Sequence, residues 1–471
     1  MKRLLIQTQL SNFNDKYKSV LECDSGWQMV MGRVREMLKL NPDLHIDVMG
    51  PDMDEGHEQC VTHPYDVNPD LWDAHAYRYG LGGVERLRYL GCKVLPNALV
   101  TRYDFDWPRV TQSLDVGMHK LDPSIRYDAV YMNDPMHLRN FKAMFHVIGG
   151  YQPKFYVHSH FVDLPTVPKF PKEASLWLGQ CEATIRADHN FWQCDSAMNQ
   201  FFNEMGDWFM PRIVEEVRSK STPWDDGYSA TEITSPIDNS NMRFTVDEWQ
   251  QKTHNKVVLF FPNRISPSSG DYTNGMKFMF ELLPEIRKQA QDFVVVCGNP
   301  NFKFINEELL QRCGKDGYVK LHDHTLNRDE FKFVARNSHV ALGLYDKDTY
   351  GGTAARECVE LGCMPLWLEN FEYSSLAREA LVGHHALTPA NFSTFVQDTV
   401  NLIKAVRHDD IHEARERLKK TIRRRCSYEM TTPAAMKIMG LLPVMDPGVC
   451  LAYAGGDNLA RFGDTSPPTG S

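Results

Sequence analysis

The sequence predicts an α/β protein built from two doubly wound parallel sheets. Short apolar runs alternate with helical patterns along its 471 residues, which is typical of strands joined by crossover helices. A chain of this length exceeds one ordinary hydrophobic core, so we expect two domains of roughly 200 residues each. A stretch rich in Ser, Thr, Asp and Pro, residues 219–254, interrupts the pattern between two such series.

Apolar runs and helical periodicity place the elements of the first series. Strands are expected over 3–9, 45–49, 92–95, 129–132 and 155–158, and helices over 28–40, 84–90 and 174–185. The run NFWQCDSAMNQFF, 190–202, predicts a strand that leads into a helix with Ser196 as its N-cap. We therefore expect an N-terminal domain over 1–220, followed by a linker or long loop over 221–254.

The second series begins with the strand KVVLFFPNR and repeats the alternation of strand and helix. Further strands are expected over 292–300, 318–323, 339–346 and 364–369, and helices over 274–290, 306–314, 328–338 and 409–425. This series predicts a C-terminal domain over 255–430. The remaining segment, 431–471, is expected to end in a disordered tail from residue 462.

Composition argues against several classes of protein. The net charge of -9 disfavours non-specific adhesion to nucleic acid or anionic lipid. The eleven cysteines contain no CxxC pair, which favours free thiols in a reducing cytoplasm over zinc or disulfides. No apolar run is long enough to span a membrane, and the start, MKRLLIQTQL, reads as a strand rather than a signal peptide. We therefore expect a cytoplasmic protein.

A glycine-rich turn suggests an anion site. The stretch DKDTYGGTAARECVELGCMPLW, 346–367, places two glycines and a threonine at a helix start. Gly351 and Gly352 allow close approach to the backbone, and the helix dipole beyond Thr353 favours an anion such as phosphate. We expect Thr353 to N-cap the helix and Gly362 to stop it. A plain strand-turn-helix unit explains the same residues equally well.

A second stretch, FFPNRISPSSGDYTNGMKF, would complete a nucleotide site. A strand runs into Asn263 and Arg264, and Lys277 follows a polar loop in the first turn of a helix. A cation there is unfavourable unless an anion lies nearby, and Arg264 can clamp a phosphate through two hydrogen bonds. Glu357, one turn into the helix of the first stretch, can accept hydrogen bonds from ribose hydroxyls. An ordinary charged surface loop is the alternative.

The third stretch, KFYVHSHFVDLP, ends a strand with two histidines, His158 and His160. Two histidines at this spacing can chelate a metal, but no third ligand lies near in sequence, so no metal is expected. A histidine at the carboxyl end of a strand is better suited to contact a sugar hydroxyl. A core histidine satisfied by backbone groups is the alternative reading.

In this order the three stretches resemble the retaining GT-B glycosyltransferases, especially the large family-4-like group. The resemblance is specific over about 256–370 and implies two Rossmann-like domains that face across a cleft. It also implies transfer of a sugar, with retention, from a nucleotide-diphosphate sugar that is UDP-linked, with no essential cofactor. Arg264 and Lys277 would neutralise the diphosphate, and either His158 or His160 would reach the donor sugar. The donor would be held by Asn263, Asp348, Thr349, Tyr350, Gly351, Gly352, Thr353 and Glu357.

The sequence departs from this family pattern at the residues that would contact the donor sugar. The usual Glu-x7-Glu spacing would place its first acid at Thr349, and Asp348 is the nearest carboxylate. An unusual donor sugar is therefore expected. The lysine that the family carries before a glycine is replaced by Asn274, so its role would pass to Lys277.

Aromatic and basic side chains in the first half suggest an acceptor site. These are Tyr77, Arg78, Arg102, Tyr103 and Trp107. Such residues suit stacking on bases and contacts to phosphate, and the basic run KKTIRRR, 419–425, can add backbone contacts. Phage DNA glycosyltransferases are GT-B enzymes that act on hydroxymethylated pyrimidines, so double-stranded DNA with a flipped base is the specific acceptor we predict. A carbohydrate site, or ordinary surface and core residues, explains them as well.

Two other functions fit the same residues. A transferase of surface polysaccharide or glycolipid synthesis would use the basic amphipathic segment 137–150 to lie on a membrane. A sugar-nucleotide epimerase, or a binding module of the same fold, would use the donor site alone.

Overall fold

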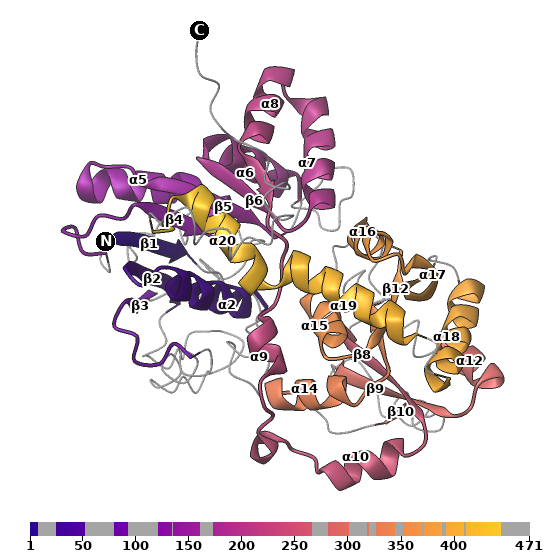
Figure 1. Cartoon of the computed structure of the whole chain (residues 1–471). Helices are drawn as coiled ribbons and strands as arrows, with labels where there is room; N and C mark the ends of the chain where they lie inside the picture. Colours follow the sequence, from indigo (N-terminus) through magenta and orange to yellow (C-terminus); the bar gives the residue numbers. More distant parts are fainter. Residues whose placement is uncertain are drawn as a thin grey trace. The chain divides into compact units, whose positions relative to one another are not determined.

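The computed structural model separates into two compact units, Met1–Asp226 with Tyr428–Ser471, and Gly227–Ser427 (Figure 1). The residues it describes are 1–7, 25–51, 80–92, 121–133, 135–160, 173–265, 281–300, 318–319, 326–343, 352–369, 371–388, 392–408 and 411–443.

The first unit is built on a parallel seven-stranded sheet in the order β3-β2-β1-β4-β5-β6-β7. Its strands are β1 (Lys2–Gln7), β2 (Leu44–Pro51), β3 (Leu87–Cys92), β4 (Ala129–Met132), β5 (Lys154–Ser159), β6 (His189–Trp192) and β7 (Ser221–Pro223). Its helices are α2 (Ser25–Leu40), η1 (Pro135–His137), α5 (Leu138–Gly149), α6 (Glu173–Arg186), α7 (Asp195–Trp208), α8 (Pro211–Ser219) and α20 (Tyr428–Met439).

Alternate residues of β1 show how this sheet is covered on both faces. Leu4 and Ile6 pack in one hydrophobic cluster with residues of α2 and α20. Leu5 packs in another cluster with residues of α5. Because successive side chains of a strand point to opposite faces, helices cover the sheet on each side, as in a doubly wound fold.

Helix α20 returns the chain to the first unit after the whole second unit has been built. In Figure 1 it lies beside α2. The Asn41 side-chain amide donates to the carbonyl of Leu441 at 2.6 Å, and the Trp224 indole donates to the hydroxyl of Thr431 at 3.2 Å. Residues from 431 onward were expected to be a separate segment, whereas those described here are part of the first core.

The second unit repeats the same topology with a parallel sheet in the order β10-β9-β8-β11-β12-β13. Its strands are β8 (Val257–Ile265), β9 (Phe293–Pro300), β10 (Tyr318–Val319), β11 (Val340–Gly343), β12 (Met364–Leu368) and β13 (Leu387–Thr388). Its helices are α9 (Ala230–Thr234), η2 (Asn239–Asn241), α10 (Val246–Thr253), α12 (Leu283–Gln289), α14 (Arg328–Arg336), α15 (Thr353–Glu360), α16 (Phe371–Glu379), α17 (Gly383–Ala386), α18 (Phe392–Arg407) and α19 (His412–Cys426).

Residues of β8 also alternate between two clusters. Leu259 packs with residues of α15, α18 and α19, while Phe260 packs with residues of α10 and α14. In each unit the first strand, β1 or β8, lies inside the sheet. The next two strands extend the sheet to one edge, and the later strands extend it from the first strand to the opposite edge. The predicted fold class, α/β with two Rossmann-like doubly wound domains, is confirmed.

Three local predictions for the first series and the segment after it were wrong. The expected helix over 84–90 is instead the end of a turn and the first four residues of the edge strand β3, which pairs with β2. Gly80 and Gly83 have positive φ in the turns before it. The N-cap of α7 is Cys194, whose sulfur accepts from Ala197, and not Ser196.

The third concerns the expected linker over 221–254, which holds regular elements. It contains β7, α9, η2 and α10. Its serines and threonines serve as helix caps: Ser229 caps α9, and Thr245 forms a capping box with Glu248 at α10. Residues that favour caps also favour loops, so composition alone suggested a linker.

Candidate functional site

Polar side chains gather at the carboxyl edge of the first sheet. Asn133 directly follows β4, His158 and His160 lie at the end of β5, and Asp226 follows β7 by three residues. Parallel strands bring their carboxyl ends to one edge, which is where doubly wound sheets bind ligands. The structure thus joins the two predicted histidines to two residues that the sequence did not single out.

Asp226 bridges the two imidazole rings. Nδ1 of His160 lies 3.0 Å from each carboxylate oxygen of Asp226, and Nε2 of His158 lies 3.2 Å from Oδ1. The ring centroids are 4.2 Å apart. On its other side, Nε2 of His160 lies 2.7 Å from Oδ1 of Asn133.

A buried arginine, Arg33, belongs to the same network through its contact with His158. Nη1 of Arg33, on α2, lies 2.6 Å from Nδ1 of His158 and 2.6 Å from the hydroxyl of Tyr131. Its guanidinium carbon lies 4.0 Å from the centre of the Trp224 ring, a cation–π contact. A lone arginine on the apolar face of a predicted helix is the sequence signal that could have drawn attention to it.

Burial and charge set the protonation of the group. Burial, followed by the positive charge of Arg33, holds the pKa of His158 well below its ordinary value. Burial alone would raise the pKa of Asp226, but the charge of His160 and the hydrogen bonds from both histidines hold that pKa well below its usual range. Because a guanidinium only donates, Nδ1 of His158 is the acceptor, and the proton of this neutral ring sits on Nε2, toward Asp226.

Three of these groups have the chemistry of metal ligands. One ligand atom from each of His158, His160 and Asp226 can be chosen so that all lie within 4.8 Å of one another. The third ligand that the sequence did not reveal is therefore Asp226. However, Arg33 fixes a proton on the nitrogen that His158 would use, and it adds a positive charge beside the site. The arrangement fits an ion-paired histidine cluster better than a cation site.

At the carboxyl edge of the second sheet, the chain passes from β11 to α15. Gly352 is the N-cap, so Thr353 is the first helical residue and not the cap that we expected. The Gly352 amide donates to the hydroxyl of Tyr373 at 3.0 Å. The predicted stop is confirmed, since Gly362 has φ +107° and Cys363 donates back to the carbonyl of Cys358 at 2.9 Å, as in a Schellman motif.

Glu357 is buried and forms an ion pair with Arg328. Its two oxygens accept from Arg328 at 2.7 and 3.0 Å, and Arg328 also donates from Nε to Glu232 at 3.0 and 3.1 Å. The sequence did not identify Arg328 or Glu232. Arg328 is the first residue of α14, where a cation is unfavourable without a nearby anion, so the argument applied to Lys277 would also have found it.

The other predicted residues fall into two groups. Asn263 and Arg264 lie in β8, where Arg264 pairs with Asn299 of β9 just after a β-bulge. Lys277, Asp348, Thr349, Tyr350 and Gly351 lie outside the described residues, as do Tyr77, Arg78, Arg102, Tyr103 and Trp107.

The basic run of α19 is engaged in ion pairs. Arg423 pairs with Glu360, and Arg424 and Arg425 pair with Glu379. Arg425 is also buried. These partners compete with the DNA backbone contacts suggested for this run.

The amphipathic helix α5 uses its apolar face inside the first unit. Leu138, Phe141, Met144 and Phe145 are buried in a core cluster with β4 and β5. The membrane contact suggested for 137–150 would need this face, which the core already occupies. No helix in the described part of the chain combines the length and apolar character needed to cross a bilayer.

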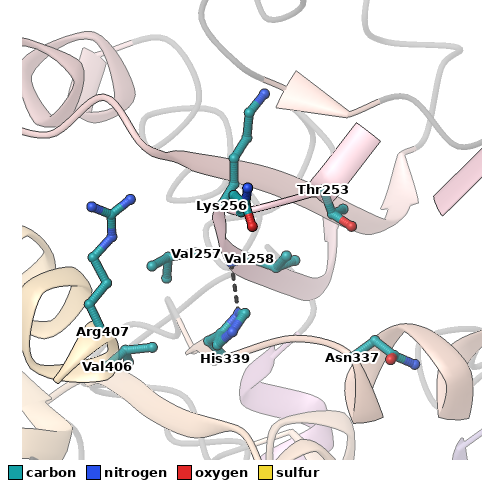
Figure 2. Close-up of a pocket in the computed structure, with 9 residues that line it drawn as sticks. Thr253, Lys256, Val257, Val258, Asn337, His339, Val406 and Arg407 are labelled. Carbon is teal, nitrogen blue, oxygen red and sulfur yellow. Dashed lines mark hydrogen bonds between the residues drawn. The ribbon is translucent and has the colours of Figure 1, made fainter. Parts of the chain in front are cut away.

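A separate hollow of about 600 Å³ lies in the second unit (Figure 2). Its lining includes Val257 and Val258, at the start of β8, and His339, just before β11. It therefore lies at the amino edge of this sheet, opposite the start of α15. Nδ1 of His339 accepts from the Val258 amide at 3.0 Å, so this histidine has a structural bond.

The sequence matches no protein-family model and no curated protein. Solved structures, in contrast, are similar over nearly the whole chain. Anabaena HepE in complex with UDP and glucose has 12% identity and a TM-score of 0.57, over 93% of this chain and 100% of that one. A trehalose-6-phosphate structure from E. coli, bound with UDP-2-fluoro glucose, has 12% identity and a TM-score of 0.58, over 93% and 99%.

A third similar structure is the α,α-trehalose 6-phosphate synthase of Burkholderia multivorans. It has 12% identity and a TM-score of 0.57, over 96% of this chain and 97% of that one. At these identities the likeness establishes the fold alone, two Rossmann-like domains of the GT-B type, over 93–96% of the chain.

Proposed function

We propose that this protein is a glycosyltransferase that moves a sugar from a UDP-linked donor to an acceptor hydroxyl, with retention. The observation that carries the proposal is the fold. Two parallel sheets follow one another in a single chain, with the same order over six strands and a seventh strand in the first sheet. Similar structures that match 93% of the chain hold UDP with glucose or UDP-2-fluoro glucose.

The second unit would bind the nucleotide. The amide groups at the start of α15 would face phosphate, beside Gly351, Gly352 and Thr353. Arg264 and Lys277 would neutralise the leaving diphosphate, and Glu357 would accept from ribose. The start of α15 supports this assignment because it lies at the carboxyl edge of the sheet, where the chain passes from β11 to α15.

The first unit would present a histidine to the donor sugar. The His158 side chain is fully buried, with 0% exposure, whereas that of His160 is 13% exposed. A ligand can therefore reach His160 without any rearrangement of the core, and we assign the sugar contact to His160.

These residues would act through fixed charge. Glycosyl transfer passes through an oxocarbenium-like state while the bond to the diphosphate breaks. Cations and helix-end amides already aimed at the departing phosphate lower the energy of that state without reorganisation. None of these steps requires a residue of this chain to form a covalent bond to the sugar.

For the acceptor, hydroxymethylated DNA is the specific proposal. The prediction of hydroxymethylated DNA rests on aromatic and basic residues outside the described part of the chain, and the basic run of α19 is ion-paired. Polysaccharide or glycolipid acceptors lose the support of α5, whose apolar face is buried. An epimerase would need the donor site alone.

The test begins with the donor. A thermal-shift panel of UDP, UDP-glucose and other nucleotide sugars should raise the melting temperature for UDP-linked compounds, because a ligand of the folded state stabilises it. The best donor is then incubated with hydroxymethylated DNA or simple sugars, and the masses of the products are measured by mass spectrometry. If no nucleotide sugar binds or is consumed, the proposal is wrong; if one is consumed without any acceptor, the protein is an epimerase or hydrolase.

A further inference from the structure

Arg328 holds the carboxylate of Glu357 by both of its oxygens. Nη1 donates to Oε2 at 3.0 Å, and Nη2 donates to Oε1 at 2.7 Å. Two parallel hydrogen bonds from one planar guanidinium fix the plane of a carboxylate, which a single contact leaves free to rotate. Within the described ranges, no other side chain donates to these two oxygens. The orientation of the Glu357 carboxylate is therefore set by Arg328.

Arg328 is itself held from its other side by Glu232. Nε donates to the two Glu232 oxygens at 3.0 and 3.1 Å, and Nη2 also donates to Glu232. All three guanidinium nitrogens are thus engaged, and the guanidinium carbon lies 5.6 Å from the centre of the Phe331 ring. The Glu232 amide in turn donates to the hydroxyl of Ser229, the N-cap of α9, at 3.1 Å. Arg328 cannot turn away from Glu357 without breaking its bonds to Glu232.

The cluster of Arg328, Glu232 and Glu357, the Arg328 cluster, can still accept hydrogen bonds. A carboxylate offers about four lone-pair positions, and Arg328 uses one on each oxygen of Glu357, so each oxygen can accept from a further donor. The cluster also carries one excess negative charge in a largely buried place, since the side chains of Arg328 and Glu357 are 10% and 6% exposed. Hydroxyl donors would stabilise that charge, whereas a phosphate would be repelled.

The Arg328 cluster lies on the side of the second sheet where ligands bind. Arg328 is the first residue of α14, the helix that leads into β11, and Glu357 is the fifth residue of α15, which follows β11. The amino ends of both helices therefore lie on the carboxyl side of the strands. Glu357 is one turn beyond the amides proposed to face phosphate, which suits the ribose of the same nucleotide.

We propose that Arg328 is a positioning residue of the nucleotide site, and that it directs both oxygens of Glu357 toward the two neighbouring hydroxyls of a ribose. Each hydroxyl would donate to one oxygen, so the site would select a ribonucleotide over its 2′-deoxy counterpart. This inference rests on the proposed function. It adds the class of nucleotide that the donor must carry and the residue on which that selection depends.

The experiment compares the binding of UDP and 2′-deoxy-UDP by isothermal titration. A lost hydrogen bond to a charged group weakens binding by roughly tenfold or more, so the wild type should prefer UDP by about that factor. Arg328→Lys keeps the charge but not the two-point contact, so we expect this preference to fall to about threefold or less. A merely structural role would weaken both ligands by the same factor and leave their ratio unchanged.

The matched control is Arg243→Lys. Arg243 makes the same two-point contact with another buried glutamate of the second unit, through Nε to Oε1 of Glu330 at 2.9 Å and through Nη2 to Oε2. Glu330 lies in α14, two residues beyond Arg328, so this variant disturbs the same helix without removing a contact of Glu357. Its preference for UDP should equal that of the wild type. A fall as large as in Arg328→Lys would mean that the effect passes through the helix, and the inference would be wrong.

The remaining outcomes separate the inference from the proposed function. A wild type that binds both ligands equally, or an Arg328→Lys variant with the wild-type preference, would overturn the inference and leave the proposed transfer unaffected. If UDP does not bind at all, the proposed function and the inference are both wrong. If Arg328→Lys does not fold, a double variant with Arg328→Gln and Glu232→Gln decides the question, because it removes one charge of each sign. It should also lose the preference for UDP, and a retained preference would overturn the inference.

Discussion

Glu357 of α15 and Glu232 of α9 both accept hydrogen bonds from the guanidinium of Arg328. A comparison of variants at these two glutamates can distinguish a role in stability from a role in ligand binding. Each carboxylate is buried and hydrogen-bonded to Arg328. Only Glu357 lies one turn into α15, beside the proposed phosphate site. Removal of either charge should disturb Arg328 similarly, so any difference between them reports on the nucleotide.

We therefore predict that Glu357→Gln weakens UDP binding and that Glu232→Gln does not. A lost hydrogen bond to a charged group is worth about 1.5–3 kcal/mol, which corresponds to roughly a tenfold to hundredfold rise in Kd. Isothermal titration with UDP measures it, and urea unfolding measures stability in parallel. Equal loss of affinity in both variants would mean that the cluster supports the fold and does not bind ribose.

His189 gives the first unit a pH dependence of known sign. Its side chain is hydrogen-bonded to Thr222 at 2.9 Å, and burial lowers its pKa to about 4. Below its unfolded pKa of about 6.5, the unfolded chain binds a proton that the folded state refuses. Stability is therefore lost as the pH falls from 6.5 toward 4.

We predict that this histidine costs the wild type about 2 kcal/mol between pH 7 and pH 5, and that His189→Gln removes this part of the loss. Urea unfolding at the two pH values measures the difference. His146→Gln, at an exposed position of α5, should leave the pH dependence as it is. If His189→Gln keeps the full wild-type loss, burial of His189 is not its source.

At the scale of elements, close packing of α2 on α20 depends on a glycine. A Cβ atom added at Gly32 would lie 2.5 Å from the ring of Tyr428, which is buried. Gly206 in α7 is the matched position, because a Cβ atom there would meet nothing within 4 Å. Both glycines are helical, so the helix propensity gained by alanine is the same.

Gly32→Ala should therefore lower stability by about 1–3 kcal/mol, the usual cost of overpacking. Gly206→Ala should instead raise it by about 0.5–1 kcal/mol, because alanine is the better helix former. Thermal or urea unfolding of the two variants gives both numbers. A neutral Gly32→Ala would show that the two helices can separate slightly without loss.

Sequence patterns predicted elements best where apolar runs were long and central. The strand at 129–132 matches β4, and the helix expected over 174–185 corresponds to α6. The edge strand β3 was missed because its polar residues, such as Arg88, follow turns rather than an apolar run. Helices α9 and α10 were missed because their serine and threonine caps resemble a loop.

At the scale of the whole molecule, the fold was predictable and the site only in part. Alternation of strand and helix is local, so two doubly wound sheets could be expected from sequence. The partners of the histidines are not local: Asp226 is 66 residues from His160, and Arg33 is 125 residues from His158. Only the topology of the sheet brings them together, and one sequence carries no signal for such distant pairs.

Contacts between residues far apart in the sequence also make the first unit depend on α20, near the end of the chain. Helix α20 and the two residues that follow it place Ala435, Met436, Met439 and Leu441 in the core that contains β1 and α2. Fully burying a large apolar side chain contributes about 1.5–3 kcal/mol. Together these side chains approach the whole stability of a typical domain, about 5–15 kcal/mol.

A chain that ends at residue 427 should therefore lose the folded first unit, although every strand of its sheet is still present. A chain that ends at residue 461 removes only the expected disordered tail and should melt within about 2 °C of the full chain, the control for truncation itself. Near-UV circular dichroism and limited proteolysis distinguish the two, since the unfolded unit should be digested while Gly227–Ser427 resists. If the shorter chain kept a protected first unit, α20 would be an addition to that core and not part of what holds it, and the histidine network at the far ends of its strands would form without it.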